Sequence, residues 1–116
     1  MNTKTLTWAG GEHAFRLGIE HLRALEQRCD AGPEEILGRL MTRTWRVSDV
    51  TDTIRLGLEG GGLAKDEARR LVAVHVEDGP LALSVELAQA IIMMALWGDP
   101  DALPMGEGEA DALDPV

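Results

Sequence analysis

Residues 81–97 constrain the fold of this chain most, because they read as one helix with almost no polar surface. Only Ser84, Glu86 and Gln89 interrupt a run of Leu, Ile, Val, Ala and Met, and from Ala90 onward the segment is apolar all round. Such a helix is either enclosed by its neighbours or offers its second face to a partner. A membrane-spanning helix needs about 20 apolar residues, so we expect this segment to lie within a folded domain.

The rest of the chain predicts a mainly α fold, a compact bundle of about five helices. Its 116 residues suit one domain, and with only four aromatic residues the core must be aliphatic. Apolar residues at helical spacing predict four earlier helices. Their apolar faces are Ile19, Leu22 and Leu25; Ile36, Leu37, Leu40 and Met41; Val50, Ile54 and Leu58; and Ala68, Leu71, Val72, His75 and Val76.

The ends of these helices are also marked in the sequence. Pro33 suits the first turn of the second helix, and Ser48 is the expected N-cap of the third. The run Gly60-Gly61-Gly62 stops the third helix, and the fourth extends over about residues 64–77. We expect residues 81–91 to pack as ordinary core helix against the first, third and fourth helices.

The first seventeen residues predict a short β-hairpin. Residues 5–8 and 12–17 alternate between apolar and polar side chains, and Ala9-Gly10-Gly11 lies between them. Glycine readily adopts the positive φ angles that a tight hairpin turn needs. Two strands alone are only marginally stable in water. The hairpin must therefore pack on the helical body or join another strand.

The negative charge of the chain is concentrated at its C-terminal end. The net charge is −9, and six acidic residues but no basic ones follow Gly98. Residues 1–98 are therefore the expected domain, and residues 99–116 a disordered acidic tail. Nucleic acids and acidic membrane surfaces are bound through clustered Lys and Arg. We expect neither as a partner.

No motif predicts catalysis, a metal site, a cofactor or a small-molecule substrate. His13, His21 and His75 lack the spacing of metal-binding motifs, and the Gly60-Gly61-Gly62 turn lacks the pattern of a phosphate-binding loop. Cys29 has acidic neighbours and reads as an ordinary thiol at a helix end. A single cysteine and the lack of an apolar leader segment suggest the reducing cytoplasm.

The end of the apolar segment is the candidate partner-binding site. Methionine adapts to irregular partner surfaces, and tryptophan often anchors interfaces. Core packing is the competing interpretation for Met93 and Met94. The basic sequence around Trp45 could meet an acidic partner, but a boundary tryptophan explains it equally well. The candidate contacts are Ile92, Met93, Leu96 and Trp97.

Six motifs in a fixed order carry a family resemblance: FRLGI at 15–19, LRALE at 22–26, WRVSDV at 45–50, IRLGLEGGG at 54–62, EARRLV at 67–72 and LWG at 96–98. The pattern resembles the small tail protein of gene transfer agents and related prophages. That family is described as a phage tail assembly chaperone, and sometimes as a tail tube protein. The resemblance covers about residues 6–98. Ala64 departs from it, because a Ser or Thr helix cap is expected there.

The resemblance implies a non-enzymatic chaperone whose partner is the tape-measure protein, a long helical ruler, or another tail protein. An apolar helix-on-helix contact would suit such a partner. Two other functions remain open. One is a structural tail subunit that polymerises, and the other is an acidic helical regulator that binds another protein.

Overall fold

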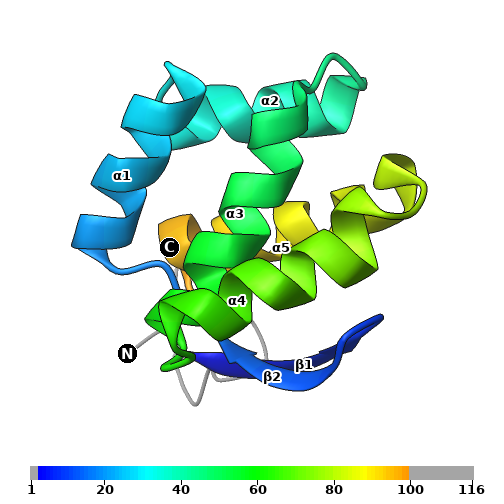
Figure 1. Ribbon diagram of the computed structural model, residues 1–116. Coiled ribbons are helices and arrows are strands. Elements are labelled where there is room, and N and C mark those ends of the chain that lie inside the picture. Colours follow the sequence, from blue (N-terminus) through cyan, green and yellow to red (C-terminus); the bar gives the residue numbers. More distant parts are fainter. Residues whose placement is uncertain (1–2, 100–116) are drawn as a thin grey trace.

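Helix α3 lies at the centre of the fold, with the other helices around it and a two-stranded hairpin beneath (Figure 1). The structure is a computed structural model and describes residues 3–99. Its elements are β1 (Lys4–Trp8), β2 (Gly11–Phe15), α1 (Ile19–Cys29), α2 (Pro33–Thr42), α3 (Val47–Gly60), α4 (Lys65–Val72), the π-helix η1 (Ala73–Glu77), the 3₁₀-helix η2 (Leu81–Ser84) and α5 (Val85–Trp97). The predicted mainly helical fold with an N-terminal hairpin is confirmed.

The core forms around the apolar stripe of α3. Val50, Ile54 and Leu58 are fully buried, as their spacing predicted. Phe15 from β2 and Ile91 from α5 are also fully buried, so hairpin and helices share one core. Of the residues predicted to face this core, Ile19 and Met41 instead leave 63% of their surface exposed. Both lie near a helix end, where periodicity says little about what packs on the last turn.

The hairpin forms within the chain, around a two-residue turn at Ala9 and Gly10. The strands pair antiparallel with Trp8 opposite Gly11 and Leu6 opposite His13. The Trp8 side chain attaches the hairpin to the helices. Its indole N–H donates to Nδ1 of His13 at 2.9 Å, and its ring contacts the rings of Phe15 and His75 edge-on.

The end of the hairpin lies directly on the backbone of α3. The Arg16 N–H donates to the Gly57 carbonyl oxygen at 3.0 Å. A Cβ atom on Gly60 would lie 1.8 Å from the Arg16 carbonyl oxygen, and one on Gly61 would lie 2.0 Å from the Ala14 carbonyl oxygen. These positions therefore require glycine for close approach as well as for ending the helix.

Three helix boundaries differ from those predicted. The N-cap of α3 is Arg46 and not Ser48, because the Asp49 carboxylate accepts the Arg46 N–H at 2.8 Å. The fourth helix ends in the π-helical turn η1, and the fifth begins with the 3₁₀ turn η2 that follows Pro80. Helix α5 packs mainly against α2 and α3, where the sequence predicts α1, α3 and α4. Apart from Asp99, the predicted acidic tail lies outside the described residues.

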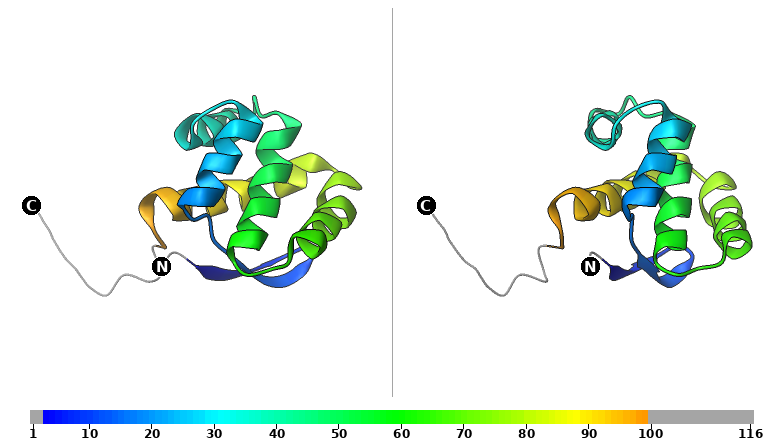
Figure 2. Two further views of the ribbon diagram at one scale, coloured as in Figure 1. Left: turned by 60° about the vertical axis from the view of Figure 1, so that its left-hand side comes forward. Right: turned by 90° about the vertical axis from the view of Figure 1, so that its left-hand side faces the viewer.

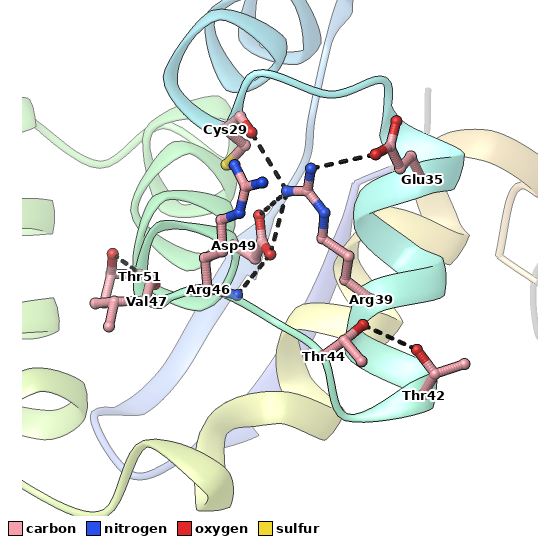
Figure 3. Close-up of polar contacts among 9 residues, drawn as sticks. All are labelled: Cys29, Glu35, Arg39, Thr42, Thr44, Arg46, Val47, Asp49 and Thr51. Carbon is pink, nitrogen blue, oxygen red and sulfur yellow. Dashed lines mark hydrogen bonds and ion pairs between the residues drawn. The ribbon is translucent and has the colours of Figure 1, made fainter.

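Arg39 joins the three helices α1, α2 and α3 at one end of the bundle (Figure 3). Its guanidinium donates to the Cys29 carbonyl oxygen at 3.3 Å and to Oδ1 of Asp49 at 3.1 Å. It also bonds Glu35 one turn earlier in α2. The Asp49 side chain is completely buried, whereas that of Glu35 is 65% exposed. Of the two ion pairs that Arg39 forms, only the one with Asp49 is therefore shielded from water.

We expect Gly60→Ala to destabilise the fold by more than about 3 kcal/mol, because the new methyl group meets backbone that cannot move aside. The matched control is Gly38→Ala in α2, where a Cβ meets nothing within 4 Å. That change should stabilise by about 0.5–1 kcal/mol, because alanine is the better helix former. Urea unfolding of both variants measures the difference. Equal free energies of unfolding would contradict the close approach.

We expect Arg39→Met to cost about 3–5 kcal/mol, because it leaves the Asp49 carboxylate buried without a cation. Glu35→Ala is the control, since it removes the exposed partner of the same guanidinium, and should change stability by less than about 1 kcal/mol. Thermal unfolding compares the two variants. A loss of similar size in both would show that the buried pair has no special role.

Candidate partner-binding groove

Helix α5 has one exposed face despite its apolar composition. Its exposed residues are Glu86, Ala90, Met93 and Trp97, which recur at helical spacing on one side. The opposite side packs into the core through α2 and α3, and Gln89 donates to the Leu40 carbonyl oxygen at the end of α2. The face toward solvent therefore becomes more apolar along the helix, from Glu86 to Trp97.

This face forms one wall of a groove, and β1 forms the other. We call it the β1–α5 groove. Its volume is about 500 Å³, and its lining residues are Lys4, Leu6, Ala90, Met93, Met94, Trp97, Gly98 and Asp99. The lining is apolar apart from Lys4 and Asp99, whose side chains form a salt bridge of 3.0 Å at its edge. In both views of Figure 2, the orange C-terminal end of α5 reaches past the dark blue strand β1.

The four predicted contacts do not all lie at this groove. Met93 is 45% exposed and Trp97 is 63% exposed, and both line it. Leu96 is partly buried against the core. Ile92 is completely buried, so it has no surface to offer a partner, and we replace it in the candidate site.

Sequence reasoning missed the opposite wall of the groove. That wall is β1, which contributes Leu6. Sequence reasoning also missed Ala90 and Met94, which line the groove from α5. The alternation of residues 5–8 places Leu6 on the inner face of the hairpin, but no local signal shows which helix that face meets. The pairing of β1 with α5 is a property of the tertiary structure alone.

A second hollow, of about 490 Å³, lies near Trp45 at the other end of α5. Its lining includes Arg43, Glu86 and Gln89, so it is more polar than the β1–α5 groove. Trp45 itself is partly buried against the core, as expected of a boundary residue. Charges of both signs line this hollow, which gives it no preference for an acidic partner.

The titratable side chains have structural roles. Nδ1 of His21 accepts the Gly18 N–H at the start of α1, and His75 packs on Trp8. Burial and the nearby Asp49 carboxylate raise the pKa of the Cys29 thiol to about 12, which makes it a poor nucleophile at neutral pH. Within residues 3–99, no group of three or more His, Cys, Asp or Glu side chains could hold a metal ion.

None of the helices among residues 3–99 is long and apolar enough to cross a membrane.

Comparison with known proteins identifies the family. Searches of curated proteins and of solved structures find no match. A family model described as "Phage tail tube protein, GTA-gp10" matches residues 2–98, which is most of the chain. The chain therefore belongs to this family of phage and gene-transfer-agent tail proteins.

Proposed function

We propose that this protein is a non-enzymatic tail assembly chaperone that binds the tape-measure protein through the β1–α5 groove. The observation that carries the proposal is the exposure of Met93 and Trp97 beside an apolar groove of about 500 Å³. Family membership supports a partner among the tail proteins. The chaperone would act in the cytoplasm of the producing cell, where tails are assembled.

The groove suits the apolar stripe of a helix. An amphipathic helix presents anchors at helical spacing, and such anchors fit a hydrophobic groove. Each large apolar side chain that becomes fully buried contributes about 1.5–3 kcal/mol, so every additional anchor strengthens binding substantially. The flexible Met93 side chain adapts to varied anchors, and Trp97 offers a large flat surface. A long tape-measure chain with repeated stripes could therefore be bound at several places.

We expect the double substitution Met93→Asp with Trp97→Ala to weaken binding to the tape-measure protein at least about a hundredfold, because it replaces both exposed anchors. Co-expression with the tape-measure protein, followed by co-purification and calorimetry, measures the loss. The control is Leu83→Asp, which places the same charge on an apolar residue that is 80% exposed outside the groove. Leu83→Asp should leave binding unchanged.

Two results would contradict this assignment. Unchanged binding by a folded double variant would exclude the groove as the interface. Lack of any complex between the native protein and the tape-measure protein would exclude the function itself. Circular dichroism of each variant separates loss of binding from loss of fold.

A structural tail subunit is the second candidate, and the family description, which names a tail tube protein, favours it. Such a subunit needs strands that pair between copies. The hairpin pairs within the chain, but it is a sheet of only two strands among the described residues and so has edges to offer. Light scattering decides between the candidates, because rings or tubes of purified protein would favour the structural role.

A further inference from the structure

The exposed residues of α5 form a stripe that continues beyond the β1–α5 groove. They are Glu86, Ala90, Met93 and Trp97, and their spacing places them above one another on one side of the helix. We call them the α5 stripe. At about 1.5 Å per residue the stripe is about 16 Å long, or about three turns. The groove is lined by Ala90, Met93 and Trp97 but not by Glu86.

The second hollow, which we call the α2–α5 hollow, lies at the Glu86 end of the stripe. From α5 it is lined by Val85, Glu86 and Gln89, and the lining of the groove begins at the next residue, Ala90. Its other wall comes from the end of α2 and the loop that follows. Helix α2 and the hairpin lie on opposite sides of α5 (Figures 1 and 2). The two hollows therefore follow each other along α5, one toward α2 and the other toward β1.

Two opposite charges line the α2–α5 hollow without pairing with each other. Arg43 is the residue that ends α2, and Glu86 lies in the first turn of α5. Both are exposed. Among residues 3–99, neither side chain forms an ion pair with the other or with any further residue. Both charges are therefore available to groups that enter the hollow.

The α5 stripe and the two hollows together define the chemistry of an occupant. Helices pack on one another along such stripes of side chains. A helix lying on the α5 stripe would place apolar side chains against Met93 and Trp97 at one end. At the other end its side chains would meet Arg43 toward α2 and Glu86 on α5. An acidic and a basic residue about one turn apart on that helix would complement both charges.

We propose that the α5 stripe and both hollows form one binding surface for an amphipathic helix of about three turns. Its apolar anchors occupy the β1–α5 groove, and a pair of opposite charges at its other end faces Arg43 and Glu86. This inference rests on the proposed function, because it specifies the helix that the groove would bind. It adds a source of selectivity, since a helix with equal anchors but wrongly placed charges is rejected at the α2–α5 hollow.

A charge exchange tests this surface. The double variant Arg43→Glu with Glu86→Arg swaps the two charges and leaves the net charge of −9 unchanged. It should weaken binding of the tape-measure protein at least about tenfold at low salt, because each position then meets a like charge. The loss should shrink at high salt, which screens exposed charges. Calorimetry at both salt concentrations measures the effect.

The matched control is the exchange Lys65→Asp with Asp66→Lys on α4. Both residues are exposed, and neither lines the groove or the α2–α5 hollow, so binding should stay unchanged. Circular dichroism confirms that both exchange variants fold. Equal losses in the two would overturn the proposal, because the effect would not be local to the hollow.

Failure of this inference is distinguishable from failure of the proposed function. If the Arg43–Glu86 exchange leaves binding unchanged while Met93→Asp with Trp97→Ala abolishes it, the α2–α5 hollow is excluded and the proposed function stands. If the tape-measure protein does not bind the native protein at all, the proposed function fails. Two synthetic helical peptides of equal composition then decide the inference alone.

The first peptide carries leucines at one end of its stripe and a glutamate and a lysine one turn apart at the other, in either order. In the second peptide, the leucines and the charged residues are interleaved. Preferential binding of the first peptide to the native protein, lost in the Arg43–Glu86 exchange variant, would support the surface. Equal binding of the two peptides would overturn it.

Discussion

The arrangement of the hairpin depends on the contact between its end and the glycine-rich end of α3. The carbonyl oxygens of Ala14 and Arg16 occupy the space where Cβ atoms would stand on Gly61 and Gly60. One turn earlier, a Cβ on Gly57 would lie only 3.1 Å from Ile91 and 3.2 Å from Phe15. Backbone packed on backbone leaves little freedom of position. These contacts fix the position of the hairpin relative to α3 and α5. The β1–α5 groove is a consequence of that fixed position.

Most elements could be predicted from the sequence because their signals are local. Period-two alternation predicts the hairpin, and the spacing of Val50, Ile54 and Leu58 predicts the buried stripe of α3. The glycine run is correctly predicted as a helix stop. Its second role, as the surface on which β2 rests, depends on a segment more than 40 residues earlier in the chain. The predicted start of α3 is wrong because the Asp49 carboxylate, three residues inside the helix, accepts the Arg46 N–H and so makes Arg46 the N-cap.

The candidate site could be predicted only in part, because the exposed face of α5 also depends on segments that are distant in the sequence. A helix that is apolar all round has no polar stripe to distinguish its exposed face from its buried face. Met93 and Trp97 are identified because methionine and tryptophan suit interfaces, which is an argument from chemistry. Ile92 is included because it begins the apolar run that ends at Trp97, but successive residues on a helix face different directions. Which side of α5 is buried is determined by α2 and α3. These helices pack against the side that carries Ile91 and Ile92.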